Sequence, residues 1–121
     1  MPDAPLAQLT HRLRAFAAER DWDRFHTPKN LAMALTGEAG ELAAEFQWLT
    51  EDESLRLDPE CRERVRQEAA DVFLYLLRLC DRLELDLVQA AFDKMDLNAR
   101  RYPADRVKGS ARKYTEYGAG E

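Results

Sequence analysis

The chain has 121 residues, of which 45% are hydrophobic and 34% charged, with a net charge of −5. These proportions are typical of a globular protein and indicate a single domain spanning residues 1–121. The negative charge disfavours a general nucleic-acid-binding protein.

Two further features exclude a membrane or secreted protein. The most apolar stretch, residues 72–79, is too short to span a bilayer, and the N-terminus lacks the features of a signal peptide. Cys61 and Cys80 fall in one predicted helix, about 28 Å apart at 1.5 Å per residue, so they cannot pair within a subunit. We therefore expect reduced thiols and a cytoplasmic protein with no membrane partner.

The first half of the chain predicts two helices. Apolar residues recur at helical spacing over residues 6–20, and residues 21–26 form a connector with two aromatic side chains. Thr27 and Pro28 are a helix-start signal for a second helix that runs to about residue 49. Residues 50–57 are polar and acidic, which predicts a loop.

The second half predicts two more helices. Asp58 and Pro59 begin a third helix that ends near residue 83, with Arg64 pairing Glu60 and Glu68 along its exposed first half. Residues 72–79 are apolar on nearly every side, which predicts burial against a partner subunit. The fourth helix follows Asp86 and ends near residue 102, before a basic tail at about 104–121. The fold class is therefore all-α, a four-helix bundle-type subunit assembled as a homo-oligomer.

An acidic ridge marks the second helix. Glu38, Glu41 and Glu45 stand at i, i+3 and i+7, and no Lys or Arg lies three or four residues from any of them. The third helix carries its own pair, Glu68 and Asp71. Because a short loop joins the two helices, they should pack antiparallel and bring both acidic groups to nearly equal depth. Such an oxygen-only cage, built from Glu38, Glu41, Glu68 and Asp71, selects Mg²⁺ or Mn²⁺.

The acidic residues have three other interpretations. Charged helix positions are commonly solvated faces, and this is the alternative for each pair alone. A di-iron bundle needs Glu-x-x-His, and neither His11 nor His26 follows a Glu at that spacing. An EF-hand loop is also absent from the sequence.

Basic and aromatic side chains could complete a nucleotide site. Lys94, Asn98, Arg101 and Tyr102 share one face of the fourth helix, where cations would hold phosphate oxygens. Stacking surface for a base could come from Trp22, Phe25, Trp48 and Tyr75. The alternatives are core packing for the aromatic residues and a solvated surface for the basic ones.

These residues resemble the signature of the all-α nucleoside triphosphate pyrophosphohydrolases, the MazG-like superfamily, and within it the dCTP pyrophosphatase branch. The similarity rests on the paired acidic motif and on segments such as Gly37-Glu-x-Gly-Glu-Leu-Ala and Arg101-Tyr-Pro-Ala104, and covers roughly residues 6–117. It implies a Mg²⁺-dependent enzyme, commonly a homotetramer, that converts a deoxynucleoside triphosphate, most specifically dCTP or a modified dCTP, to the monophosphate and pyrophosphate.

The resemblance also implies roles for individual residues. The metal ligands and catalytic residues would be Glu38, Glu41, Glu68 and Asp71. The nucleoside would be surrounded by residues 22–26, with Trp22, Phe25 and His26, and by Trp48 and Tyr75. The triphosphate is assigned on charge grounds to Lys94, Asn98, Arg101, Arg112 and Lys113, and Tyr102 is a further substrate-binding residue.

Two positions depart from the family pattern or lie outside it. The animal enzymes carry a histidine at the position of Leu13, which leaves the base preference open. Glu45 is outside the four-acid signature and is interpreted as a surface residue, with a water-orienting carboxylate as the alternative. The alternatives for function are a related enzyme acting on dUTP or another non-standard nucleotide, and a non-catalytic helical adaptor. A dimer is the alternative to the tetramer.

Overall fold

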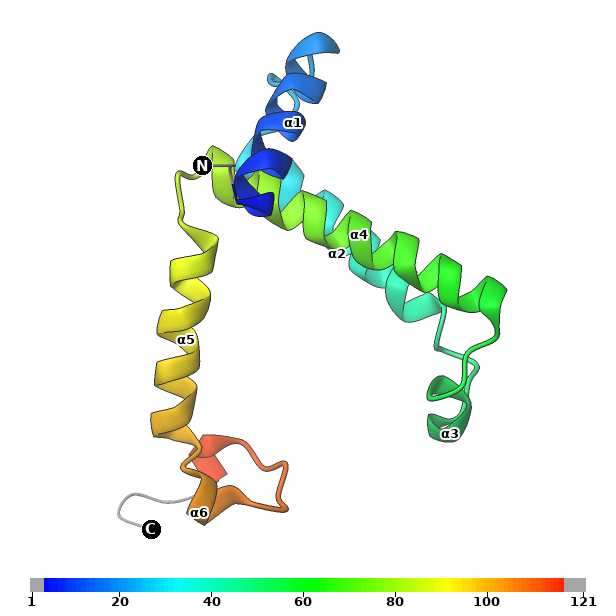
Figure 1. Cartoon of the computed structure of the whole chain (residues 1–121), viewed down its shortest axis with the longest axis vertical. Helices are drawn as coiled ribbons and strands as arrows, with labels where there is room; N and C mark the ends of the chain where they lie inside the picture. Colours follow the sequence, from blue (N-terminus) through cyan, green and yellow to red (C-terminus); the bar gives the residue numbers. More distant parts are fainter. Residues whose placement is uncertain (1–3, 117–121) are drawn as a thin grey trace. The chain divides into compact units, whose positions relative to one another are not determined.

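A computed structural model of the chain describes residues 4–116, and the chain divides into two compact units between Leu85 and Asp86 (Figure 1). Every regular element within residues 4–116 is helical, so the all-α prediction is confirmed. The first unit holds four helices: α1 (Pro5–Glu19), α2 (Pro28–Ala44), α3 (Glu51–Ser54) and α4 (Pro59–Arg82). The second holds α5 (Leu87–Arg101), α6 (Ala104–Val107) and the 3₁₀ turn η1 (Tyr114–Glu116). The expectation of one domain over residues 1–121 stays a prediction.

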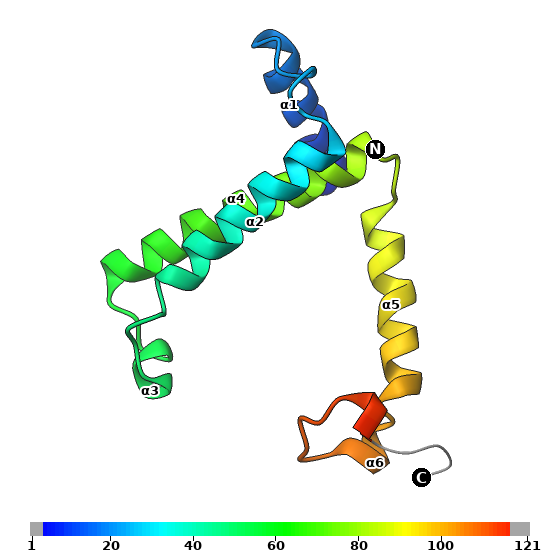
Figure 2. The ribbon, with the colours of Figure 1, turned by 180° about the vertical axis from the view of Figure 1, so that it is seen from behind.

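An antiparallel pair of helices, α2 and α4, is the centre of the first unit; the two lie side by side in Figures 1 and 2. Both begin where the sequence predicted. The Thr27 side chain accepts a hydrogen bond from the Asn30 amide at 3.2 Å, and Asp58 accepts one from the Cys61 amide at 2.8 Å. Each cap satisfies a helix-end N–H that would otherwise lack a partner. The buried residues of the first unit are Ala17, Leu31, Cys61, Leu77, Arg78 and Cys80.

The segment between α2 and α4 differs from the prediction. The second helix ends at Ala44 rather than near residue 49, and the acidic segment predicted as a loop contains α3. The reason is a capping box: the Thr50 hydroxyl accepts from the Glu53 amide at 3.1 Å, and the Glu53 carboxylate accepts from the Thr50 amide at 2.9 Å. These reciprocal bonds start a new helix and separate it from α2.

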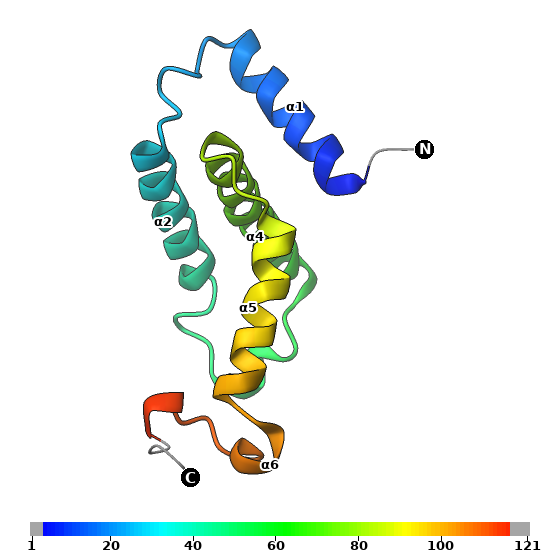
Figure 3. The ribbon, with the colours of Figure 1, turned by 90° about the vertical axis from the view of Figure 1, so that its left-hand side faces the viewer.

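The connector from α1 to α2, followed in Figure 3, begins with a left-handed residue. Asp21 has φ of 56°, and the Trp22 amide donates to the Ala17 carbonyl at 2.8 Å, which is a Schellman ending. The same geometry ends α4, where Glu84 has φ of 56° and the Leu85 amide donates to the Cys80 carbonyl at 2.8 Å. The first of these turns sets where Trp22 leaves the helix.

The apolar run on α4 is only partly covered. Leu77 is buried, whereas Phe73 keeps 39% of its surface exposed. Burial of this run against a partner subunit therefore stays a prediction. Both cysteines are buried and free, as expected. Among the described residues no helix has the length and apolarity needed to cross a bilayer.

The second unit begins as predicted. Asp86 caps α5 by accepting from the Gln89 amide at 3.0 Å, and the helix ends at Arg101, before Pro103. The segment predicted as a basic tail contains α6 and η1 over its described part.

Candidate active site

Three carboxylates from α2 and α4 meet in the first unit. One oxygen from each of Glu38, Glu41 and Glu68 lies within 4.8 Å of the other two. The sequence predicted this convergence from the antiparallel pairing, and the packing of α2 on α4 produces it. Three like charges at this separation repel one another unless a cation or a proton compensates them.

The electrostatics of the cluster favour such compensation. Burial raises the pKa of Glu38 to about 7, and the negative charges of Glu41 and Asp71 add to the effect. Burial also raises the pKa of Glu68, with Glu41 as the next contributor. The Oε2 atoms of Glu38 and Glu68 are buried with no hydrogen-bond partner among the described residues. Two buried carboxylate oxygens without donors favour an additional positive group at this point.

Asp71 lies one turn beyond Glu68 on α4 and is not one of the three converging carboxylates. Its charge nevertheless raises the pKa of both Glu38 and Glu68. Asp71 also lines a pocket, described next, so it is the residue that joins the carboxylate cluster to that pocket.

The pocket has a volume of about 490 Å³, within the range of ligand sites in proteins. Its walls come from α1, the connector and α4, and include Leu13, Trp22, His26, Asp71, Tyr75 and Arg78. Trp22 packs edge-on against Phe16, with ring centroids 5.7 Å apart, and lies 6.1 Å from the His26 ring. The structure therefore brings together Trp22, His26 and Tyr75, all three predicted to surround a nucleoside.

Two other aromatic residues with the same predicted role do not line this pocket. Phe25 is 54% exposed and stacks under the Arg24 guanidinium at 4.9 Å. Trp48 is 87% exposed, in the turn that follows α2. Their contact with a nucleoside stays a prediction.

Glu45 is neither a free surface residue nor an available carboxylate. Its Oε1 accepts a hydrogen bond from Arg64 Nε at 2.9 Å, and its side chain is only 20% exposed. Arg64 is therefore drawn away from the pairing with Glu60 and Glu68 that the sequence predicted, because its side chain reaches across to α2. This ion pair neutralises the third acid of the ridge, and among residues 4–116 no ion pair with a basic side chain is found for Glu38, Glu41 or Glu68.

The residues predicted to hold the triphosphate belong to the second unit. Lys94, Asn98 and Arg101 lie on α5, and Tyr102 is its C-terminal cap. Arg112 and Lys113 lie in the exposed segment before η1. Their role toward a triphosphate stays a prediction.

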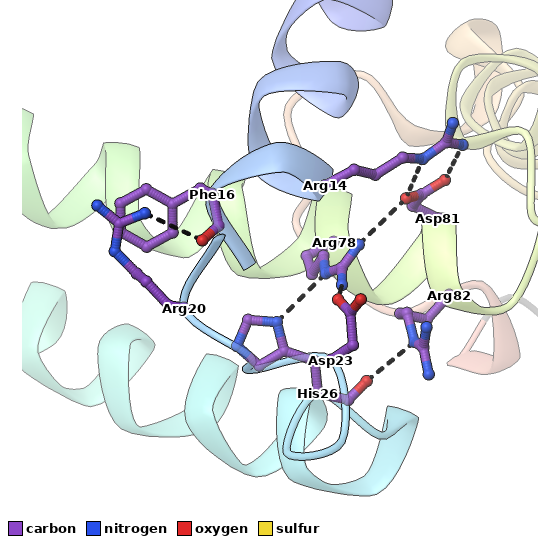
Figure 4. Close-up of polar contacts among 8 residues, drawn as sticks. All are labelled: Arg14, Phe16, Arg20, Asp23, His26, Arg78, Asp81 and Arg82. Atoms are coloured by element: carbon purple, nitrogen blue, oxygen red, sulfur yellow. Dashed lines mark hydrogen bonds and ion pairs between the residues drawn. The ribbon is translucent and has the colours of Figure 1, made fainter. Parts of the chain in front are cut away.

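A network around Arg78 was missed from the sequence (Figure 4). Arg78 is 4% exposed and donates to Asp23 at 2.7 Å and to His26 Nδ1 at 3.2 Å. It also pairs with Asp81 at 3.5 Å, and Asp81 accepts two hydrogen bonds from Arg14. The sequence does show a lone arginine inside an apolar run, with Asp81 three residues later, which could have indicated a buried ion pair. Its partners in the connector could not be found in this way, because they lie more than 50 residues away in the sequence.

Known proteins resemble the chain over most of its length. It is 46% identical to human dCTP pyrophosphatase 1 over 95% of this chain and 69% of the human protein. The bovine protein of the same name is 47% identical over 93% of this chain and 68% of its own length. No family model matches the chain.

A solved structure gives the same result. A pyrophosphatase from Archaeoglobus fulgidus matches with a TM-score of 0.80 and 38% identity, over 85% of this chain and 96% of that one. The resemblance inferred from the acidic motif is thereby confirmed. The carboxylate cluster, the aromatic pocket beside it and these similarities together place the chain in the dCTP pyrophosphatase family of nucleotide-hydrolysing enzymes.

Proposed function

We propose that this chain hydrolyses dCTP, or a modified dCTP, to the nucleoside monophosphate and pyrophosphate. The observation that carries the proposal is Asp71, which lines the aromatic pocket and acts electrostatically on the carboxylate cluster. A nucleoside in the pocket would place its phosphates toward the acidic residues.

A divalent cation suits the cluster, because two buried carboxylate oxygens lack donors and all the donors are hard oxygen atoms. We assign Glu38, Glu41, Glu68 and Asp71 as its ligands and Mg²⁺ as the ion, with Mn²⁺ as the substitute. When bound, such an ion neutralises phosphate charge and lowers the pKa of water.

The side chains of the enzyme then have separate tasks. Tyr75 and Trp22 hold the nucleoside, and a carboxylate, Glu38 or Glu41, accepts the proton of the water that attacks phosphorus. Glu45 is a poor base because Arg64 occupies its Oε1. Lys94, Arg101, Arg112 and Lys113 belong to the second unit, and they stay the residues predicted on charge grounds to bind the phosphates.

Glu41→Gln and Glu68→Gln variants test the site. We expect each to lower kcat/KM for dCTP at least about 100-fold, since even indirect metal partners cost 10- to 100-fold. Glu63→Gln is the matched control: Glu63 is also on α4, but it accepts hydrogen bonds from Arg66 and Gln67 of the same helix. Full Mg²⁺-dependent activity in both site variants would overturn the assignment.

Base preference needs a separate experiment. Pyrophosphate release from all common and modified dNTPs would distinguish dCTP from dUTP or another non-standard nucleotide. Leu13 lines the pocket, so it is the residue expected to shift this preference. The helical adaptor is no longer supported, because the chain belongs to an enzyme family.

We further propose a homo-oligomer, a tetramer or a dimer, in the cytoplasm. Large apolar side chains that remain exposed support it: Val88, Phe92 and Met95 recur on α5 at i, i+4 and i+7 and are 46%, 64% and 65% exposed. The free thiols of Cys61 and Cys80 suit a reducing compartment.

A further inference from the structure

Arg78 is a buried cation whose bonds run to the connector. Its guanidinium donates to Asp23 Oδ1 at 2.7 Å and to His26 Nδ1 at 3.2 Å, and both residues lie between α1 and α2. Burying a charge is favourable only when it is paired and hydrogen-bonded. The arginine therefore ties to α4 the segment that delivers Trp22 and His26 to the pocket.

The hydrogen bond from Arg78 determines which ring nitrogen of His26 carries the proton. An arginine side chain has only donors and keeps its proton, so the nitrogen that faces it must be an acceptor. Nδ1 is then unprotonated, and a neutral His26 must carry its proton on Nε2. Burial and the charge of Arg78 lower the pKa of His26, with Asp23 opposing them and Arg82 adding to them, which favours the neutral ring.

His26 is also a wall of the pocket, beside Trp22 and Tyr75. In Figure 4 its second ring nitrogen points away from Arg78. An N–H in a pocket with apolar walls gains most from a hydrogen-bond acceptor on the ligand. A pyrimidine nucleoside offers carbonyl oxygens and a ring nitrogen as acceptors.

We propose that Arg78 is a positioning residue that holds His26 in the Nε2–H form, so that His26 donates a hydrogen bond to an acceptor on the nucleoside part of the substrate. The donor role rests on the proposed function, in which this pocket takes the nucleoside. The tautomer rests only on the contacts of the free protein.

Nitrogen-15 NMR of the substrate-free full chain tests the tautomer. The chain has two histidines, so a His11→Gln variant assigns both imidazoles. We expect His26 to show a protonated Nε2 and an unprotonated Nδ1 at pH 7.5. A protonated Nδ1 in His26, or averaging of the proton between its two ring nitrogens, would overturn the proposal without reference to activity.

Two arginine variants separate positioning from general stability. Arg78→Met should release His26 into a mixture of tautomers and raise KM for dCTP roughly two- to tenfold, with a smaller change in kcat. Arg82→Met is the matched control, because Arg82 donates to the His26 backbone carbonyl at 3.1 Å and not to the ring. The Arg82 variant should keep the Nε2–H form; loss of that form in both variants alike would contradict a specific role for Arg78.

A titration identifies the acceptor. Deoxycytidine should shift the His26 Nε2 resonance and inorganic pyrophosphate should not. A shift with pyrophosphate alone would overturn the nucleoside acceptor in favour of a phosphate oxygen. If neither compound shifts the resonance although the enzyme hydrolyses dCTP, the donor role of His26 fails while the proposed function stands.

Discussion

The ionisation of Glu38 should make the stability of the metal-free protein depend on pH. Its pKa is raised from 4.5 to about 7 by burial and by neighbouring carboxylates. Between these two pH values the folded state holds a proton on Glu38 that the unfolded state has released. The contribution of Glu38 to stability is therefore fully present below about pH 4.5 and is lost as pH rises toward about 7. Above that range the folded protein carries the unfavourable charge.

Glu38→Gln mimics the protonated side chain and should remove this pH dependence. With a chelator present, we expect the variant to melt at a higher temperature than the wild type at pH 8 and at nearly the same temperature at pH 4.5. Circular dichroism melts at the two pH values make the comparison, with Glu51→Gln as an exposed control. An equal difference at both pH values would show that the side-chain amide, and not the charge, is responsible.

Site residues could be predicted from the sequence where local spacing decides their position, but not where their partners lie on another element. Glu38, Glu41 and Glu68 could be found from spacing, because helical periodicity and a short loop determine which faces meet. Arg64 and Arg78 could not, because each takes its partner from another element, Glu45 in one case and Asp23 and His26 in the other. Local sequence gives an arginine several possible partners, and only tertiary packing chooses among them.

At the scale of elements, the ion pair between Arg14 and Asp81 holds α1 against α4. Arg14 donates from Nε at 2.8 Å and from a second nitrogen to the other carboxylate oxygen, and these hydrogen bonds lower the pKa of Asp81. A lowered pKa contributes stability above the ordinary value of 3.8, and that contribution is lost as pH falls through the folded-state pKa.

Asp81→Asn should therefore destabilise the protein at neutral pH and much less in acid. We expect a loss of about 2 kcal/mol at pH 7, since hydrogen bonds to charged groups contribute about 1.5–3 kcal/mol. Urea titrations at pH 7 and at pH 3 measure the difference. A loss that is equally large at both values would mean that the carboxylate charge contributes nothing to the contact between α1 and α4.

A substitution of the left-handed residue after α4 should stabilise the protein, in contrast to Asp81→Asn. Glu84 has φ of 56°, a conformation that costs a side-chain-bearing residue about 1–2 kcal/mol and glycine little. After subtracting the backbone entropy of glycine, Glu84→Gly should stabilise the first unit by about 0.5–1 kcal/mol. Glu63→Gly, inside the same helix, is the matched control and should destabilise by about 1 kcal/mol. Thermal melts that show the same sign for both variants would contradict this account.

Element boundaries were predictable where a local signal fixes them. Caps at Thr27, Asp58 and Asp86 placed three helix starts correctly, because each cap bonds to an amide only three residues away. The end of α2 was missed, because apolar spacing continues through Phe46 and Leu49 while the backbone already turns. The capping box of α3 was present in the sequence, but its surrounding acidic residues favoured a loop.

At the scale of the whole molecule, each of the two units keeps large apolar side chains exposed. Trp48 is 87% exposed and Leu55 78%, and the stripe of Val88, Phe92 and Met95 on α5 is also open. Scattered exposed apolar residues are ordinary, whereas an aligned helical stripe is typical of an interface, so the stripe supports the proposed oligomer. The apolar run of α4 is the other surface that the sequence predicted to meet a partner subunit.

Phe92→Glu tests whether the stripe on α5 is an interface between copies of this chain. A charge at the centre of an apolar contact leaves an unpaired buried carboxylate, so we expect a shift toward smaller species than the wild-type oligomer. Light scattering after size exclusion gives the mass directly, for comparison with 14.0 kDa per copy. Ala90→Glu is the matched control: it adds the same charge at an exposed position of α5 outside the apolar stripe. A wild-type mass of one copy would refute the oligomer, and an unchanged mass in Phe92→Glu would place the interface elsewhere, with the apolar run of α4 as the next surface to test.

An interface between copies also stabilises the folded chain. The Phe92→Glu variant should therefore melt at a lower temperature than the wild type, and the melting temperature of the wild type should rise with protein concentration.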